Sequence, residues 1–323
     1  MIQKADLPKV IVTGGAGFVG SHLVERLLAD GRAVVVIDDC STGNLSNLSS
    51  VRSHPSLAVI ASKVSEVSNL RREIAGAECI YHLAASVGVE LVINNPVQTL
   101  ANNLVETEKI LSAAAQEQVP LLLTSTSEVY GKSERLEFSE TDDLQIGPPN
   151  LTRWGYACSK LMDEFMALAY ARSEELPVVV VRLFNTVGPR QTGRYGMVLP
   201  RFIESALSDQ PIRVFGDGAQ SRCFCDVRDV VEALVRLQRC PAARGEVVNV
   251  GGNCEISIAN LAETVRQTLG SKSSIELVPY NVAYGPGFEE MRRRRPSIAK
   301  LERLTGFRPA ISLEEIIRHA AGR

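Results

Sequence analysis

The sequence predicts an α/β protein, a doubly wound parallel sheet of the Rossmann type joined to a smaller α+β domain. Three observations support this fold class. Short, almost wholly apolar runs alternate with helical segments through the first half of the chain, as expected for parallel strands that are buried on both faces. A glycine-rich turn joins the first apolar run to the first helix, and Asp38 follows the second run. Residues 188–218 are rich in glycine, proline and arginine, and the later apolar runs are short.

The strands and helices are expected in a regular order. Phe18–Asp30 is a predicted helix because its apolar residues share one face and Gly31 ends it. The other long helices are expected at Val97–Gln118 and Tyr156–Glu174, and the strands of the sheet at Val10–Thr13, Ala33–Ile37, Leu57–Ala61, Cys79–Leu83, Pro120–Thr124 and Val178–Leu183. The second half is expected to hold a helix near Pro200–Ser208 and strands at Ile212–Phe215, Val247–Val250 and Ile275–Val278. We therefore expect one domain over 1–184, to which 212–250 partly returns, and a second over 185–323.

Length and charge exclude several classes of protein. A chain of 323 residues is long enough for roughly two domains. The formal net charge of −2 provides no field that would attract nucleic acid or an acidic membrane surface. Since no apolar run could span a bilayer and the N-terminus lacks a signal-peptide core, we expect a soluble cytoplasmic protein. The seven cysteines form no CxxC pair, so we expect free thiols and no metal site.

The turn after the first strand is typical of a dinucleotide-binding site. It contains Gly14, Gly17, Phe18, Val19 and Gly20. Glycines allow the tight turn, the approach of a pyrophosphate to the backbone and the close packing of helix on strand. The helix that begins here presents unpaired N–H groups to the phosphates. Asp38 is placed to accept both ribose hydroxyls and to repel the extra phosphate of NADP, so we expect NAD as the cofactor.

A tyrosine and a lysine form the candidate catalytic pair. Tyr156 and Lys160 lie four residues apart on a predicted helix and therefore share one face. A tyrosine has a pKa of about 10 and is a poor base at neutral pH. A nearby ammonium and a positively charged nicotinamide ring both favour its phenolate form.

In these motifs, the chain resembles the extended short-chain dehydrogenases/reductases that act on nucleotide sugars, namely the epimerases, dehydratases and decarboxylases. The matching elements are the glycine run 14–20, Asp38, His82-Leu83-Ala84-Ala85, Asn103 with Thr107, the segment 124–131, Tyr156 with Lys160, Arg182-Leu183-Phe184-Asn185, Gly188-Pro189-Arg190, Arg222 and Asp229. They extend over nearly the whole chain and are together highly specific. One position departs from the pattern: many members have an aspartate at the adenine after the third strand, where this chain has Ala61-Ser62-Lys63-Val64.

The resemblance implies a role for each matching residue. Tyr156 would deprotonate the sugar 4-hydroxyl during transfer of hydride to NAD, with Thr126 bonded to the same oxygen and Lys160 holding the nicotinamide ribose. Leu83, Ala84, Ala85 and Asn103 would join the cofactor site. Asn185, Arg190 and Arg222 would hold the nucleotide diphosphate of the sugar, with UDP as the nucleotide that the family implies, since arginine forks suit phosphate oxygens.

The segment Thr126-Ser127-Glu128 distinguishes between the possible reactions. The 4,6-dehydratases have an acid at the position of Ser127, and the 4-epimerases usually have a small residue at that of Glu128. UDP-glucuronate decarboxylases resemble the chain best here and also around Arg294, which in that family lies at the sugar carboxylate with the Ser and the Glu. A UDP-glucuronate decarboxylase that forms UDP-xylose or the 4-keto pentose is therefore the main hypothesis, with Ser127, Glu128 and Arg294 as catalytic residues and Arg294 also as a substrate contact.

Three other functions stay open. They are a 4-epimerase of a UDP-hexose or UDP-hexuronate, a 4,6-dehydratase, and a regulator that senses NAD without catalysis, although such regulators typically lose the Tyr or the Lys. In the family, the two long helices at 97–118 and 156–174 pair with those of a second copy. Leu161, Phe165, Leu168 and Ala169 form an apolar stripe that fits such an interface, so we expect a homodimer.

Overall fold

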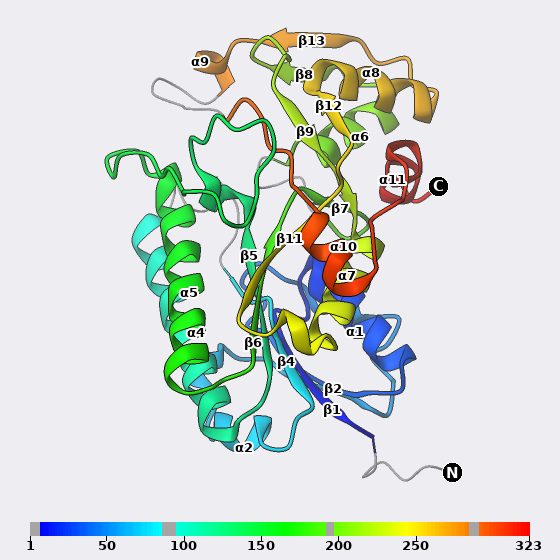
Figure 1. Ribbon diagram of the computed structural model, residues 1–323. Coiled ribbons are helices and arrows are strands. Elements are labelled where there is room, and N and C mark those ends of the chain that lie inside the picture. Colours follow the sequence, from blue (N-terminus) through cyan, green and yellow to red (C-terminus); the bar gives the residue numbers. More distant parts are fainter. Residues whose placement is uncertain (1–6, 86–94, 192–196, 284–290) are drawn as a thin grey trace.

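A seven-stranded parallel sheet lies at the centre of the molecule (Figure 1). The computed structural model describes residues 7–85, 95–191, 197–283 and 291–323. The sheet has the order β11-β6-β5-β4-β1-β2-β3, and each pair of neighbours is parallel. Its strands are β1 (Lys9–Thr13), β2 (Ala33–Ile37), β3 (Leu57–Ile60), β4 (Cys79–His82), β5 (Leu121–Thr126), β6 (Val178–Leu183) and β11 (Glu246–Val250). The predicted α/β fold class is confirmed.

Helices cover both faces of this sheet because its strands are apolar on both sides. On one face, α1 (Phe18–Ala29), α7 (Val227–Gln238) and α10 (Ala299–Thr305) share a core with the sheet. On the other face, α2 (Leu70–Ile74), α4 (Pro96–Glu117) and α5 (Arg153–Ser173) form a second core. Strand order reverses between β1 and β4, and ligands of doubly wound sheets bind at the carboxyl ends of the strands at such a point.

A smaller group of elements stands beyond the carboxyl ends of the strands, at the top of Figure 1. It contains two two-stranded sheets: β8 (Ile212–Phe215) with β13 (Ile275–Val278), and β9 (Ser221–Cys223) with β12 (Glu255–Ser257). Helices α6 (Val198–Leu207), α8 (Ile258–Leu269) and α11 (Leu313–Ala320) pack together with β8 in a separate core. A third small sheet, β7 (Thr186–Val187) with β10 (Cys225–Asp226), lies between this group and the central sheet.

Short elements fill the connections. They are the 3₁₀ helices η2 (Leu45–Leu48), η3 (Val64–Glu66), η4 (Ser127–Tyr130) and η6 (Pro241–Ala243), and the helical turn α9 (Tyr280–Ala283). Two boundaries differ from those predicted in a way that affects the site. Strand β5 continues past Thr124 to Thr126, because the polar Ser125 and Thr126 still pair in register with Arg182 and Leu183 of β6. Helix α5 begins three residues before Tyr156 and so includes Arg153.

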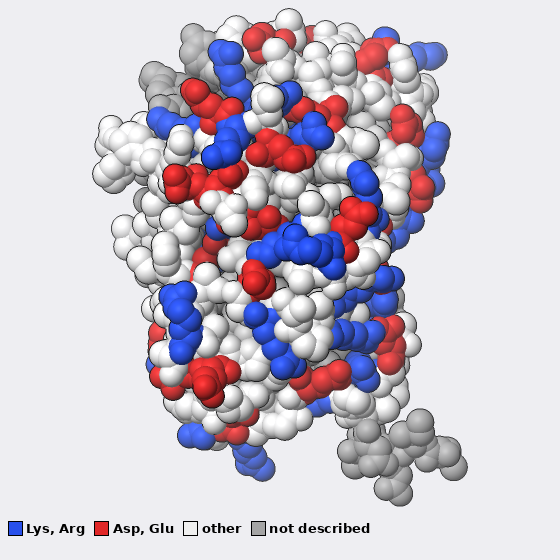
Figure 2. All heavy atoms as spheres, in the orientation of Figure 1, with Lys and Arg blue, Asp and Glu red and all other residues white. Residues whose placement is uncertain are grey.

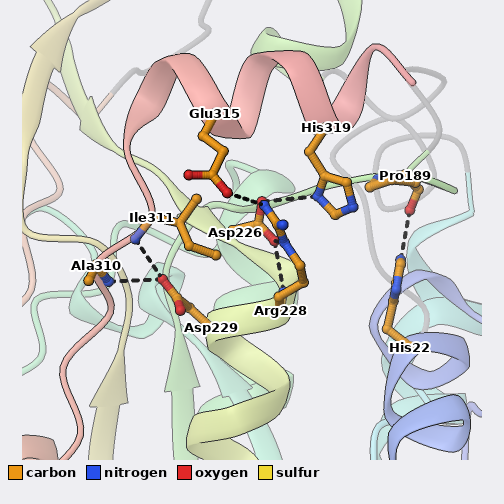
Figure 3. A network of polar contacts seen from close by, with 9 residues as sticks. All are labelled: His22, Pro189, Asp226, Arg228, Asp229, Ala310, Ile311, Glu315 and His319. Atoms are coloured by element: carbon orange, nitrogen blue, oxygen red, sulfur yellow. Dashed lines mark hydrogen bonds and ion pairs between the residues drawn. The ribbon is translucent and has the colours of Figure 1, made fainter. Parts of the chain in front are cut away.

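A polar network ties α11 to the start of α7 (Figure 3). The fully buried Asp226 caps α7 by accepting a hydrogen bond of 2.9 Å from the backbone N–H of Arg228. Its carboxylate also pairs with the Arg228 guanidinium at 2.9 Å and with Nδ1 of His319, on α11, at 3.1 Å. One turn along α7, Asp229 accepts hydrogen bonds from the backbone N–H groups of Ala310 and Ile311.

The surface charge agrees with the small formal net charge of −2, and the cysteines are unpaired. Acidic and basic side chains alternate over the face drawn in Figure 2, without a large area of one sign. All seven cysteines are free in the structure, as predicted. In the described part of the chain, there is no helix that combines the length and the apolar character needed to cross a membrane.

Candidate active site

The glycine turn between β1 and α1 forms a cradle with no room for a side chain at Gly14 or Gly20. Gly14 has a φ of +71°, and a Cβ added there would lie 2.7 Å from the backbone nitrogen of Ala84. A Cβ on Gly20 would lie 2.1 Å from the carbonyl oxygen of Gly14. Among the described residues, no side-chain hydrogen bond caps α1 at Gly17, and the first turn of α1 carries no acidic residue. The amides and the positive end of this helix are therefore available to a ligand phosphate.

Asp38 lies directly after β2 and faces the same turn. It is 8% exposed. One carboxylate oxygen accepts a hydrogen bond of 2.8 Å from the backbone N–H of Ala16, and the other accepts one of 2.8 Å from Cys40. Burial raises the pKa of this carboxyl, and the two hydrogen bonds oppose the rise. Because each carboxylate oxygen has a further lone pair, Asp38 can still accept the hydroxyls of a ribose.

The predicted segment after β4 lies opposite the glycine turn. Leu83, Ala84 and Ala85 follow this strand, and the Ala84 N–H lies 3.3 Å from the Thr13 hydroxyl. Below them, the buried ring of His82 bonds through Nδ1 to Thr13 at 2.7 Å and through Nε2 to Thr107 at 3.2 Å. Burial and the nearby Lys160 charge lower the pKa of His82 to about 3. The ring is therefore neutral, and its two hydrogen bonds connect β1 with α4 beneath the site.

Helix α5 and the end of β5 bring the predicted catalytic pair together with Thr126. Tyr156 is half-buried on α5, and its phenol shares a hydrogen bond with the Thr126 hydroxyl at the end of β5. Lys160, one turn further along α5, is only 2% exposed. Asn103 of α4 reaches the same region and donates a hydrogen bond of 3.1 Å to Ser159, the neighbour of Lys160. Burial, then the carboxylates of Glu128 and Asp163, raise the pKa of Tyr156, while Thr126 and Arg294 oppose the rise.

Glu128 is held between two arginines beside this tyrosine. Its carboxylate pairs with Nη2 of Arg153 at 3.1 Å and with Nη2 of Arg294. The three side chains are 16%, 9% and 11% exposed, respectively. Burial by itself would raise the pKa of Glu128, but the charges and hydrogen bonds of Arg294 and Arg153 outweigh it and lower the pKa. Glu128 is therefore a carboxylate at neutral pH and orients both guanidinium groups.

The segment that carries Arg294 is anchored on both sides. Phe138 donates its backbone N–H to the carbonyl of Arg295 at 2.8 Å, and Ser221 of β9 donates to Arg292 at 2.9 Å. Met291 joins Trp154 and Phe138 in a small buried cluster. These contacts bring Arg294 to Glu128 although the two lie 166 positions apart in the chain. Ser127 is also at this point, buried in η4 at 2% exposure.

The predicted diphosphate residues fall into two places. Asn185, just after β6, donates a hydrogen bond of 2.9 Å to the carbonyl of Cys223 on β9. Arg222 of β9 is 7% exposed and donates to the carbonyl of Ser221 at 2.7 Å. Arg190 lies elsewhere, beside α1.

The guanidinium of Arg190 pairs with Glu25 of α1 at 2.6 Å and donates to the carbonyl of Asn47 in η2 at 3.0 Å. Asn47 in turn donates to the Ala16 carbonyl at 2.9 Å, so the structure places Arg190 on the side of the glycine turn. The role of all three residues at a diphosphate stays a prediction.

Two residues of the site were not predicted from the sequence. Arg153 is absent from the predicted set, yet its position three residues before Tyr156 puts it on nearly the same face of α5. Asp163 follows Lys160 by three residues and pairs with it at 2.8 Å. In both cases, helical spacing could have placed the residue near the tyrosine and the lysine. Its burial and its ion-pair partner became visible only in the structure.

The comparisons with known proteins show which family the chain belongs to. The family model described as GDP-mannose 4,6 dehydratase matches residues 11–320. A relative from Bacillus cytotoxicus named UDP-N-acetyl-alpha-D-glucosaminuronate decarboxylase is 36% identical over 95% of this chain and 94% of its own length. UDP-glucuronic acid decarboxylase 2 of Arabidopsis thaliana is also 36% identical, and the chain spans 66% of that relative.

A solved structure extends the likeness to three dimensions. The UDP-glucuronic acid 4-epimerase of Bacillus cereus, determined with UDP-glucuronic acid and NAD, superimposes with a TM-score of 0.86 at 27% identity. The alignment covers 97% of this chain and 98% of that structure. The family model covers nearly the whole chain, and the fold agrees with it, so the chain belongs to the GDP-mannose 4,6-dehydratase family of nucleotide-sugar-modifying enzymes.

Proposed function

We propose that this protein is an NAD-dependent decarboxylase of a UDP-linked uronic sugar, with UDP-glucuronate as the first candidate. The observation that carries the proposal is the cluster of Glu128, Arg153 and Arg294 next to Tyr156. Two arginines beside the catalytic base suit a substrate that carries a carboxylate. In the described part of the chain, the Nε–H of Arg294 is buried without a hydrogen-bond partner, which leaves a donor for such a group.

The residues of the glycine turn fit NAD. Its pyrophosphate would meet the start of α1, where Gly14 and Gly20 keep the backbone accessible, and its adenosine ribose would meet Asp38. When bound, NAD would accept hydride from C4 of the sugar and so supply the oxidation. Related proteins of this fold are known with NAD bound, among them the Bacillus cereus epimerase.

Tyr156 and its neighbours would handle the proton of the sugar. The phenolate of Tyr156 takes the proton of the 4-hydroxyl, and Thr126 positions the same oxygen. Lys160 stabilises the phenolate by its charge. The pKa of Tyr156 is raised by burial, Glu128 and Asp163, so additional positive charge at the site is needed before the phenolate forms near neutral pH.

The two arginines would then act on the carboxylate. A uronic sugar oxidised at C4 is a β-keto acid, because its C6 carboxylate lies β to the new ketone: the C5–C6 bond breaks, carbon dioxide leaves, and the electron pair passes into an enolate on the 4-keto oxygen. Arg294 and Arg153 orient the carboxylate before cleavage, and a proton returns to C5 afterwards. Ser127, which is buried and not acidic, cannot serve as the acid that a dehydratase needs at this position.

The test is to incubate the protein with NAD and, separately, UDP-glucuronate, UDP-N-acetylglucosaminuronate, UDP-glucose and dTDP-glucose, and to follow products by mass spectrometry. We expect loss of one carbon dioxide, and only from the uronates. Loss of water from dTDP-glucose, or turnover of neutral sugars alone, would contradict the proposal. Retention of NAD without turnover of any sugar would instead indicate a sensor.

A 4-epimerase of a UDP-hexuronate is the second candidate. The likeness to a solved UDP-glucuronic acid 4-epimerase favours it, and an arginine pair would hold the carboxylate of that substrate equally well. The two reactions separate after the common oxidation: epimerisation gives a product of unchanged mass with a new chromatographic position.

We also propose that two copies of the chain pair through α4 and α5. These helices carry exposed apolar residues on their outer surface, namely Val97 (81% exposed), Val105 (47%), Met162 (50%) and Phe165 (58%). The predicted stripe on α5 is divided: Leu161 and Leu168 pack on the protein's own cores, whereas Phe165 and Ala169 are exposed. In a two-fold dimer, each copy would cover the exposed apolar side chains of the other with the same helix pair. The cytoplasmic location stays a prediction.

A further inference from the structure

The strongest unassigned feature is a buried ion pair beneath the catalytic tyrosine. Lys160 and Asp163 lie 2.8 Å apart, and their side chains are 2% and 0% exposed. An ammonium buried to this extent costs several kcal/mol without a partner. Tyr156, Lys160 and Asp163 follow one another at helical spacing on the same face of α5. Asp163 therefore stands behind Lys160 as seen from the phenol.

The surroundings leave this carboxylate as the counter-charge of Lys160. From β4, His82 is neutral, and from α4, Thr107 and Asn103 are uncharged. The neighbouring Glu164 is committed to Arg182 at 2.8 Å. On the far side of Tyr156, Glu128 is committed to Arg153 and Arg294. In the described part of the chain, Asp163 is the acid that pairs with Lys160.

We propose that Asp163 is a positioning residue that holds the Lys160 ammonium in the base of the site and withholds part of its charge from Tyr156. The proposal deepens the proposed function, since it rests on Tyr156 as the base. With Asp163 in place, the phenol keeps its proton in the ligand-free enzyme. Burial, Glu128 and Asp163 together raise the pKa of Tyr156, which is the direction expected if Asp163 opposes the charge of Lys160.

The first test titrates the phenol without substrate or turnover. The ultraviolet signal of tyrosinate is followed against pH in the wild type and in Asp163→Asn, with the same variants carrying Tyr156→Phe as blanks. We expect the Tyr156 signal at lower pH in Asp163→Asn, and the wild-type position in Glu174→Gln, which removes an exposed acid from the end of the same helix. An unchanged titration in Asp163→Asn overturns the proposal.

A second pair of variants covers the case in which Asp163→Asn fails to fold, because it leaves a buried ammonium unpaired. Lys160→Met is compared with Lys160→Met/Asp163→Asn, which buries no charge at either position. The double variant should titrate Tyr156 at lower pH than the single one. Equal titrations would show that Asp163 does not act on the phenol, and would overturn the proposal.

Activity provides the final arm. The acidic limb of kcat/KM against pH should move to lower pH in Asp163→Asn, with several-fold more activity at the acidic end, since one pKa unit changes the phenolate population about tenfold. Asp163→Glu, which keeps the charge, should restore the wild-type profile. If no nucleotide sugar is turned over, the proposed function fails, whereas the phenol titration still decides the role of Asp163.

Discussion

At the scale of single residues, Glu128 connects the acid–base pair with the two arginines. It carries a full charge because Arg294 and Arg153 lower its pKa against the effect of burial. The same charge raises the pKa of Tyr156. A substrate carboxylate that binds the two arginines would compete with Glu128 for them. It would therefore also change the pKa of Tyr156, which both Glu128 and Arg294 influence.

Arg294→Gln should abolish most of the decarboxylation and leave NAD bound. The substitution removes the guanidinium that pairs with Glu128, and losing one oriented donor at a reacting centre costs about 100-fold or more in rate. Product formation by mass spectrometry and NAD binding by fluorescence titration measure the two effects. Arg292→Gln, at the exposed neighbour in the same segment, should behave as wild type. Equal losses in both variants would show that Arg294 has no special role.

Gly14→Ala should damage both stability and NAD binding. Gly14 and Gly31 have similar φ values of +71° and +75°, but a Cβ meets Ala84 only at Gly14 and nothing within 4 Å at Gly31. Gly31→Ala should cost only the roughly 1–2 kcal/mol of left-handed backbone strain. Gly14→Ala should cost more and weaken NAD binding at least about tenfold, because the cradle must open. Urea unfolding and NAD titration of both variants test this, and similar results for the two would contradict it.

At the scale of elements, Asp226 joins α7 and α11 (Figure 3). Burial opposes its charge, but the hydrogen bonds from Arg228 and His319 outweigh burial and lower its pKa below 3.8. A lowered carboxyl pKa contributes stability that is complete above the unfolded value and is lost as the pH falls through the folded one.

Asp226→Asn should therefore lower the free energy of unfolding by about 1–3 kcal/mol at neutral pH. The deficit should shrink as the pH falls below 3.8, the usual value for this carboxyl. Urea unfolding at neutral and acidic pH measures both values. Glu314→Gln, at an exposed position of α11, provides the control and should change little. A deficit that stays constant with pH would mean that the Asp226 charge is not its source.

At the scale of the whole molecule, the outer surface of α4 and α5 determines the proposed assembly. Phe165→Asp should convert the dimer to a monomer, because it places a charge among apolar side chains that the second copy would cover. Leu277→Asp on β13 is a matched control, since Leu277 is 62% exposed and Phe165 is 58% exposed. Size-exclusion chromatography with light scattering gives the masses. A monomeric wild type, or a dimeric Phe165→Asp, would contradict the pairing.

The sequence by itself determined the features that are local in the chain. The glycine turn with Asp38, the alternation of strands and helices, and the Tyr156–Lys160 spacing all depend on neighbours within one βα unit or one helix. Steric demands on glycine and the periods of strand and helix can be read from such short stretches.

The tertiary structure alone decided the charges around the catalytic pair. Glu128 and Arg294 meet across 166 positions, Arg153 adds a second guanidinium, and Arg190 turns to Glu25 and the glycine turn. Within one apolar stripe, Leu161 and Leu168 are partly buried and Phe165 is exposed. The Lys160–Asp163 pair is almost fully buried, so each charge depends on the other for its stability. Desolvation and pairing set the energy of a charge, and both depend on side chains that come from distant parts of the chain.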